Sequence, residues 1–315
     1  MPFVTAFYRA LGTGMVISVD SPIDDKVRSA MESLIEDYEH VLSRFRNDSL
    51  IAAIGKAEHG GSFDFPDWCA PLFDLYDALF SATSGAIDPC VGEDLIRLGY
   101  DASLSFTVTQ DAPEHLGALR GRAVWGRDVT RHGTTLVTHE PVQLDFGACG
   151  KGYLVDLLGR MLQSSQFVID AGGDLLIHAE QPISVALEDP EDQSHAIGIA
   201  HIANGALCAS APSRRHWNVA VNERTQIAIH HLLNAIDGLP AQQTEASWAY
   251  IPANATLNLA RDYPTAVADG LATALFVSDV AQLQHTFDFT YATLDESRQI
   301  AVSRNFPAEL FLRSA

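Results

Sequence analysis

The chain has 315 residues, of which 47% are hydrophobic, and its formal net charge is −20. That hydrophobic content supports a large buried core, which excludes a disordered protein. The negative charge excludes general binding to nucleic acids or anionic membranes, so a phosphate-bearing ligand would need local cations, a metal ion or a helix N-terminus.

The amino-terminal segment, MPFVTAFYRALGTGMVISVD, has no long apolar stretch after a basic start and continues directly into strand-like sequence. No segment of the chain reaches the roughly 18 apolar residues that a membrane span needs. We therefore expect a cytoplasmic protein without membrane insertion. The four cysteines lack CxxC spacing, which is typical of reduced, buried thiols; they are Cys69, Cys90, Cys149 and Cys208.

The first predicted helix follows Ser21-Pro22-Ile23-Asp24, where a serine cap precedes a proline and an acidic residue stands three positions after the cap. Apolar residues then recur at helical spacing as far as Leu42. A second helix is predicted over residues 67–83, ended by Ser84-Gly85, and a third over residues 151–162.

Short β-branched runs between and after these helices predict strands. They lie at residues 16–19, 135–138, 167–169, 183–186, 217–221 and 299–302. Helices and strands are thus mixed without a regular βαβ period. No internal repeat or low-complexity linker divides the chain, so we expect one domain over residues 1–315, built as a single unit or as two intertwined lobes.

The stretch Leu144–Asp156, LDFGACGKGYLVD, places a glycine-rich turn and one lysine between a strand-like run and a helix-like run. It is not a P-loop, because GxxxxGK[ST] needs four residues between its glycines and a Ser or Thr after the lysine. A turn that enters a helix still presents N–H groups to a phosphate, and its carbonyls are able to ligate a cation. The alternative is a helix entry whose glycines serve close packing.

An apolar helix is predicted over residues 264–277, after a proline start. Thr265, Asp269 and Thr273 are four residues apart, so their oxygens lie on one face. A carboxylate and a hydroxyl one turn apart suit Mg²⁺, a hard cation that usually keeps several waters and bridges to substrate phosphates. In the alternative, Asp269 pairs within the core and Thr273 bonds back to a backbone carbonyl.

Six motifs, taken in this order, resemble those of the ApbE family, the FAD:protein FMN transferases. They are Leu11-Gly12-Thr13, Ser43–Ser49 (SRFRNDS), Ser84–Gly92 (SGAIDPCVG), Leu144–Asp156, Asp170–Asp174 (DAGGD) and Ala268–Ala274 (ADGLATA). Each motif alone is modest, whereas six in the same order are specific. The resemblance implies an α+β fold of the ApbE type, a T-fold-like mixed α/β domain that binds FAD with Mg²⁺ at its pyrophosphate.

The resemblance also implies site residues by position. In the family the metal lies between a carbonyl of the glycine-rich turn, matched by Ala148, and helix oxygens matched by Asp269 and Thr273. The positions that match family flavin contacts are Leu11, Phe45, Ala86, Ile87, Asp88, Asp145, Lys151 and Leu233. Apolar groups suit the isoalloxazine face, carboxylates suit ribityl or adenine-side donors, and the lysine suits phosphate. For Leu11 and Phe45 the alternative is ordinary core packing.

Family members cleave the FAD pyrophosphate, transfer FMN to a threonine hydroxyl of a partner protein and release AMP. The implied partners are therefore FAD and an acceptor flavoprotein with an exposed threonine motif. His231 matches the family histidine of HxIDP and is the expected base; the alternative is a structural histidine on a strand. Mg²⁺ would offset the charge that develops on the reacting phosphate.

Two motifs depart from the family pattern. The family's IDPxTG appears as Leu233–Gly238, LNAIDG, so its aspartate is Asn234, and an amide cannot take a proton as a carboxylate can. The family's TSGDYE appears as Ala209–Arg214, ASAPSR, which loses the glycine, the acid and the tyrosine. Two interpretations are open for Arg214, Arg215 and Trp217. They supply replacement phosphate or stacking contacts, or they are ordinary surface residues.

These departures leave three functions open. The first is a working FMN transferase, the second an Mg²⁺-dependent FAD hydrolase that yields FMN and AMP, and the third a flavin-binding carrier without turnover. The transferase ranks first because the inner positions all remain, and the drift is confined to the outer motifs; the inner positions are Ala148, Lys151, His231, Asp269 and Thr273. The acceptor, the oligomeric state and the choice between Mg²⁺ and Mn²⁺ are not fixed by the sequence.

Overall fold

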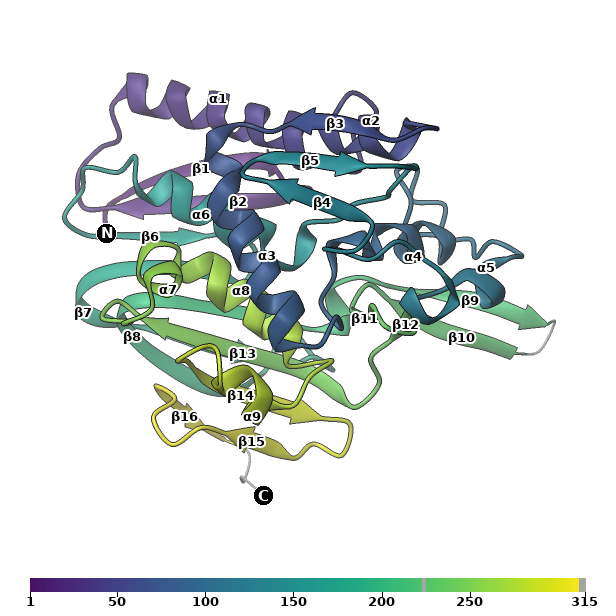
Figure 1. The fold of residues 1–315 in the computed structure, drawn as a ribbon. Helices are drawn as coiled ribbons and strands as arrows, with labels where there is room; N and C mark the ends of the chain where they lie inside the picture. The colour runs from purple at the N-terminus through teal and green to yellow at the C-terminus, as the bar shows by residue number, and fades with distance from the viewer. Residues whose placement is uncertain (223–224, 312–315) are drawn as a thin grey trace.

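The computed structural model of the protein describes residues 1–222 and 225–311, and a large antiparallel sheet forms its base (Figure 1). Within these residues the sheet has nine strands in the order β1-β2-β6-β7-β8-β13-β14-β15, with β16 paired to β8. Their bounds are β1 (Phe3–Ala10), β2 (Thr13–Val19), β6 (Phe167–Asp170), β7 (Asp174–Glu188), β8 (Ala196–Ser210), β13 (Thr244–Pro252), β14 (Thr290–Asp295), β15 (Ile300–Val302) and β16 (Ala308–Leu310).

Two helices cover the middle of this sheet, and further helices lie over them. Helices α6 and α8 lie between the main sheet and α3 (Figure 1). Helix α1 also packs against α6. The α-helices in the described ranges are α1 (Asp25–Leu42), α2 (Leu50–Lys56), α3 (Ala70–Ala82), α4 (Gly92–Arg97), α5 (Ala112–His115), α6 (Gly147–Gly159), α7 (Asn258–Asp262), α8 (Pro264–Ala274) and α9 (Val280–Gln284).

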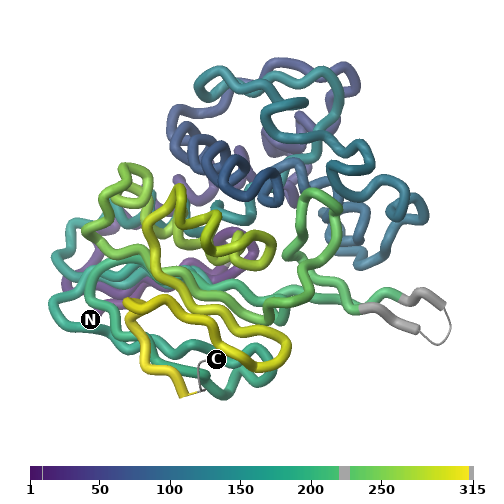
Figure 2. Tube along the Cα trace, turned by 60° about the horizontal axis from the view of Figure 1, so that its bottom comes forward, coloured from purple at the N-terminus to yellow at the C-terminus, as the bar shows by residue number. Residues whose placement is uncertain are grey.

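Three small sheets complete the fold. One is three-stranded, in the order β3-β5-β4, and two are hairpins, β9–β10 and β11–β12. The β9–β10 hairpin projects from the body in both views (Figures 1 and 2). Their bounds are β3 (Gly61–Asp64), β4 (Val129–His132), β5 (Thr135–Thr138), β9 (His216–Asn222), β10 (Thr225–His230), β11 (Leu233–Asn234) and β12 (Leu239–Pro240).

The predicted elements are present, with shifted ends. All six predicted strand runs fall within or overlap strands of the structure. The first helix, however, is capped by Asp24 and not by Ser21, because the Asp24 carboxylate accepts the N–H of Lys26 at 2.8 Å. The second helix is split into a 3₁₀ turn at Asp67–Cys69 followed by α3, and the apolar helix predicted over 264–277 ends at Ala274.

The glycine-rich stretch is not a turn before a helix but the first part of α6 itself, which begins at Gly147 rather than at Lys151. Glycine is needed at position 152 because a Cβ there would lie 2.3 Å from the backbone oxygen of Thr265 in α8. The two helices are joined further by Asp156, whose carboxylate accepts the N–H groups of Thr265 and Ala266. Close packing of α6 on α8 therefore explains the glycine at position 152.

We predict that Gly152→Ala lowers the free energy of unfolding by about 2 kcal/mol, because overpacking against a backbone atom forces the two helices apart. Gly150→Ala is the matched control in the same helix. A Cβ at Gly150 would be in ordinary contact, 3.4 Å from the hydroxyl oxygen of Tyr38, and alanine favours the helix. Denaturant unfolding of both variants checks this; equal stability of the two would contradict the packing role.

Hydrophobic side chains form a main core beneath and between the helices and a second core on the strands β7, β8 and β13 to β15. A third, smaller cluster joins Trp217 and Ile229 of the β9–β10 hairpin to Leu95, Leu98 and Leu116. All four cysteines are buried and unpaired, as the sequence predicted. No helix in the described ranges has the length and apolar character required to cross a membrane.

Candidate functional site

Helices α6 and α8 and the start of β7 bring three charged side chains together. The ammonium of Lys151 lies 2.9 Å from Asp174 Oδ2 and 3.2 Å from Asp269 Oδ1. Both carboxylates are almost fully buried, with side chains 1% and 2% exposed. The N–H of Gly152 also donates to Asp269 Oδ2 at 3.0 Å. Two buried carboxylates thus share one lysine.

The charge balance at this cluster is negative. Burial raises the pKa of Asp269, the nearby Asp174 carboxylate raises it further, and the positive charge of Lys151 lowers it. When both carboxyl groups are ionised, one ammonium faces two negative charges, and an additional cation would neutralise the surplus and favour the ionised form of Asp269. The alternative reading of Asp269, pairing within the core, is therefore true only in part, because Lys151 does not offset both acids.

Further oxygens stand beside this cluster. Thr273, one helical turn after Asp269, places its hydroxyl 3.4 Å from that of Ser210. In a regular helix the N–H of Gly152 points toward the carbonyl oxygen of Ala148. The same N–H donates to Asp269, so the Ala148 carbonyl and the Asp269 carboxylate lie close together. Carboxylate, hydroxyl and carbonyl oxygens form a donor set suited to Mg²⁺.

No three His, Cys, Asp or Glu side chains gather as a metal-binding group within residues 1–222 and 225–311. A metal ion here would therefore depend on hydroxyl, carbonyl, water and substrate oxygens in addition to carboxylate. That is the usual situation for Mg²⁺ at a site that binds phosphates. The residues present fit this ion better than they fit zinc.

His231 follows strand β10, and its Nδ1 lies 3.1 Å from the carbonyl oxygen of Arg215. A carbonyl only accepts, so Nδ1 carries the proton and Nε2 keeps a free lone pair. Burial lowers the pKa of His231 to about 4, and the positive charges of Lys151 and Arg215 act in the same direction. The imidazole is therefore neutral at physiological pH and able to accept a proton.

This lowered pKa predicts an unusual pH dependence. The unfolded chain takes up a proton at His231 near the ordinary value of 6.5, whereas the folded chain does so only near 4. Between these values the unfolded state binds more protons, so the contribution of His231 to stability falls as the pH falls. A reaction that needs the neutral imidazole should show no acid limb near pH 6.5, which a pH–rate profile will test.

The positions matched to flavin contacts divide into exposed and buried groups. Phe45 is 40% exposed, so ordinary core packing is wrong for this residue. Leu11 is half-buried in the β1–β2 turn with a positive φ of 53°, and its N–H donates to Glu39. Buried side chains, each no more than 6% exposed, are those of Ala86, Ile87, Asp88 and Leu233.

Asp88 is held by groups of the protein itself. Its carboxylate accepts the N–H of Cys90 at 2.7 Å and faces the buried guanidinium of Arg122 at 3.5 Å. Arg122 also donates to the carbonyl of Ala235, and the N–H of Ala235 donates to the carbonyl of Ala86. The turn at residues 86–88 and the turn after Leu233 are therefore locked side by side.

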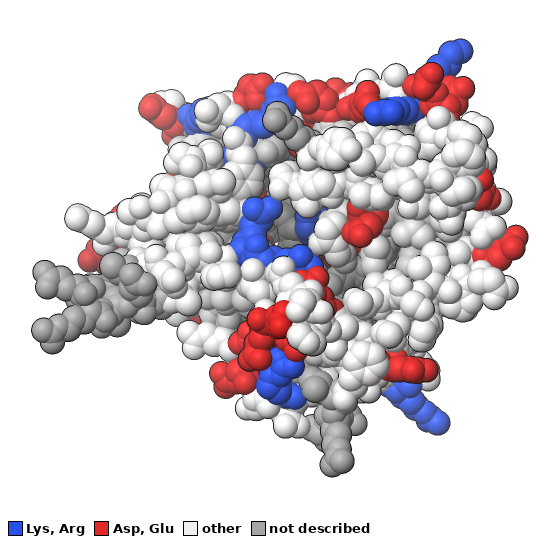
Figure 3. Space-filling view, turned by 180° about the vertical axis from the view of Figure 1, so that it is seen from behind, with Lys and Arg blue, Asp and Glu red and all other residues white. Residues whose placement is uncertain are grey.

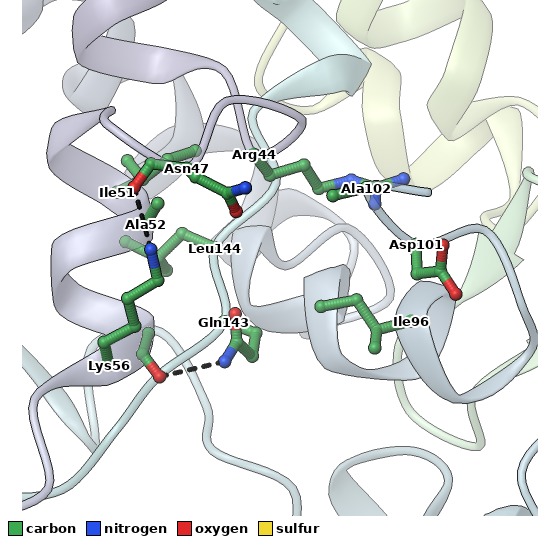
Figure 4. A pocket seen from close by; sticks show the side chains of 11 residues that line it. Arg44, Asn47, Ile51, Ala52, Lys56, Ile96, Asp101, Ala102, Gln143 and Leu144 are labelled. Carbon is green, nitrogen blue, oxygen red and sulfur yellow. Dashed lines mark hydrogen bonds between the residues drawn. The ribbon is translucent and has the colours of Figure 1, made fainter. Parts of the chain in front are cut away.

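Arg44 organises the remaining flavin-matched positions, and sequence reasoning did not single it out. Its guanidinium pairs with Asp145 and stacks between Phe45, at 4.1 Å, and Tyr100, at 4.6 Å. Beside it lies a cavity of about 230 Å³, across which Arg44 reaches toward Ala102 (Figure 4). Asp145 is thus positioned by a partly buried ion pair.

Two other residues were missed as site members. Asp174 belongs to the DAGGD motif, whose last position signals an acid but not its partner, and Ser210 ends β8 without any local signal. Both reach the cluster only through the pairing of β7 with β8, which places Asp174 opposite Cys208, two residues before Ser210. Their roles depend on sheet register, which the sequence pattern does not reveal.

The departures from the family pattern have clear structural consequences. The Asn234 side-chain oxygen accepts the N–H of Ile236 at 3.0 Å, an acceptor role that an aspartate would also perform. A ligand-stacking role is wrong for Trp217, which is 6% exposed and donates its indole N–H to the carbonyl of Leu98. Arg214 pairs with Glu188 at 2.7 Å, whereas Arg215 is exposed beside Gly12.

Solved structures match this fold over nearly its whole length. The ApbE protein of Thermotoga maritima superposes with a TM-score of 0.78 at 19% identity, covering 98% of this chain and 99% of that one. The flavin transferase ApbE of Vibrio cholerae gives a TM-score of 0.75 at 17% identity, covering 96% and 97%. The expected α+β fold of the ApbE type is therefore confirmed.

Sequence comparison agrees with the structural match. An FAD:protein FMN transferase of Klebsiella pneumoniae is 23% identical over 274 residues, which are 83% of this chain and 74% of that protein. Another with the same name, from Treponema pallidum, is 27% identical over 286 residues, or 80% and 72%. Residues 11–293 match the sequence model of the ApbE family, and the chain belongs to that family.

Proposed function

We propose that this protein is an FAD:protein FMN transferase that cleaves the FAD diphosphate with Mg²⁺, attaches FMN to a threonine of an acceptor flavoprotein and releases AMP. The main support for this proposal is the cluster in which Asp174 and Asp269 share Lys151 beside the hydroxyls of Thr273 and Ser210. Its surplus negative charge and hard oxygens suit a divalent cation that faces phosphates. The names of the relatives support the same activity.

In the proposed reaction the acceptor threonine oxygen attacks the phosphorus of the FMN half, and the bond from that phosphorus to the bridging oxygen breaks. The bridging oxygen leaves with AMP. His231 accepts the threonine proton at Nε2, since Nδ1 is engaged with the Arg215 carbonyl. Lys151 holds the two acids in place beside the diphosphate and offsets part of their charge. Mg²⁺, when bound, would supply charge neutralisation and in-line orientation of the phosphates.

The test is incubation of the purified protein with FAD and Mg²⁺, with and without an acceptor that carries a threonine motif, followed by mass analysis of acceptor and nucleotides. Acceptor that gains FMN, with an equal amount of AMP, supports the transferase. FMN and AMP with unmodified acceptor would show a hydrolase, since water uses the same residues. Intact, bound FAD would show a carrier.

His231→Asn is expected to lower the transfer rate by about 100-fold, the lower range for loss of a general base. Asparagine keeps an N–H for the Arg215 carbonyl but lacks the free basic nitrogen. His230→Asn is the matched control, because the neighbouring ring bonds the carbonyl of Ala241 and the N–H of Leu232. Equal transfer rates for the two variants would show that His231 is not the base of the reaction.

A further inference from the structure

A second cavity, of about 220 Å³, opens next to the candidate site. Its wall combines aromatic rings with a basic run that stands where the family motif is lost; the lining residues are Tyr100, Phe106, Ser213, Arg214, Arg215 and His216. From Ala209 to His216 the chain carries no carboxylate, although the protein as a whole has a charge of −20. Lys and Arg side chains gather beside a hollow in the middle of one face (Figure 3).

Most cations in this neighbourhood are already neutralised. Lys151 is shared by Asp174 and Asp269, and Arg44 pairs with Asp145. Arg214, in the same basic run, pairs with Glu188 at 2.7 Å.

Arg215 differs from these cations. Its side chain is exposed, as is that of Arg214, but within the described ranges its hydrogen bond is to the carbonyl of Gly12 at 3.4 Å and it forms no ion pair with a carboxylate. A guanidinium on a neutral carbonyl keeps its full positive charge and most of its donors. Within the part of the chain that the structure describes, Arg215 therefore offers the site a cation without a carboxylate partner, free to bind a phosphate.

The position of Arg215 is fixed relative to the candidate site. Its carbonyl accepts from both the backbone N–H and the Nδ1 of His231, at 3.4 and 3.1 Å. Its guanidinium reaches Gly12, the residue after Leu11, in the β1–β2 turn. The charges of Arg215 and Lys151 both lower the pKa of His231.

We propose that Arg215 binds a phosphate of the FAD diphosphate and so determines the preference of this site for the dinucleotide. The inference rests on the proposed function. A guanidinium binds phosphate through paired N–H donors, and here it would offset the negative charge that Asp174 and Asp269 present to the same ligand. Arg215 directly follows Ala209–Arg214, the segment that lacks the family's acid, so no carboxylate of that segment competes for it.

The experiment measures equilibrium binding of FAD, ADP and riboflavin to the full-length protein in the presence of Mg²⁺. For Arg215→Ala we expect roughly 10-fold weaker binding of FAD and of ADP, the effect of losing a charged hydrogen bond, and unchanged binding of riboflavin, which has no phosphate. Arg215→Lys should bind FAD and ADP with intermediate affinity, because a lysine keeps the charge but loses the paired donors.

Arg261→Ala is the matched control, since that exposed guanidinium pairs with Asp262 and does not line the cavity, and it should leave all three affinities within about twofold. Unchanged FAD and ADP binding in Arg215→Ala would overturn the inference, as would an equal loss for riboflavin. If Arg215→Ala binds FAD normally but needs a higher acceptor concentration for half-maximal FMN transfer, Arg215 contacts the acceptor protein and the inference is wrong. If the unmodified protein fails to bind FAD, the proposed function itself is refuted.

Discussion

Asp269→Asn is expected to lower the rate of FAD cleavage by about 100-fold or more. Asparagine has nearly the same size and still accepts the N–H of Gly152, but it removes the charge that attracts a divalent cation. Loss of a metal contact removes several kcal/mol of transition-state stabilisation, and about 2.7 kcal/mol corresponds to a factor of 100. The measurement is AMP release at saturating FAD over a titration of Mg²⁺.

The Mg²⁺ titration separates a metal role from a structural one. Asp269→Asn should need a much higher Mg²⁺ concentration for half-maximal rate, and Thr273→Val should shift the midpoint in the same direction, while Thr273→Ser keeps the hydroxyl and should not. Asp262→Asn is the charge-matched control, because this acid pairs with Arg261 on the exposed surface. An unshifted midpoint in Asp269→Asn would exclude that residue as a metal ligand.

The sequence predicted the local elements because their signals are local. Helical spacing before Leu42 and β-branched runs such as 135–138 need no tertiary information. The errors arose where two local signals competed. Ser21 and Asp24 are both good caps, and only the folded chain selects the second. Glycines normally indicate a turn, but the glycine at 152 serves contact with a helix more than 100 residues away in sequence.

Burial of single aromatic side chains was also beyond the sequence. Phe45 and Trp217 carry equal signals as core or stacking residues, yet the first is 40% exposed on Arg44 and the second is 6% exposed in the third hydrophobic cluster. That cluster forms only when the β9–β10 hairpin packs beside Leu95 and Leu98. Which residues line a site therefore depends on contacts that no local pattern encodes.

Lys151→Met is expected to lower the free energy of unfolding by about 3 kcal/mol, since it leaves Asp174 and Asp269 buried together without their counterion. This value is at the lower end for a broken buried pair because the lysine side chain is itself 35% exposed. Lys56→Met is the matched control; that ammonium donates to the exposed carbonyl of Asn47, and its loss should change stability by less than about 1 kcal/mol.

The pH dependence of Lys151→Met distinguishes repulsion between the acids from lost packing. Without the ammonium, the pKa of Asp269, already raised by burial and by Asp174, rises further. Above the pKa of the unfolded chain, the folded state then holds the extra proton, so the free energy of unfolding falls as the pH rises. Denaturant unfolding should show a small loss of stability near about pH 5 and the full loss near about pH 8.

Added Mg²⁺ should restore part of the stability of Lys151→Met at the higher pH, because a cation that binds the folded state replaces the missing charge. A loss that is independent of both pH and Mg²⁺ would mean that Lys151 acts through its methylene packing and that the two acids do not form a cation site.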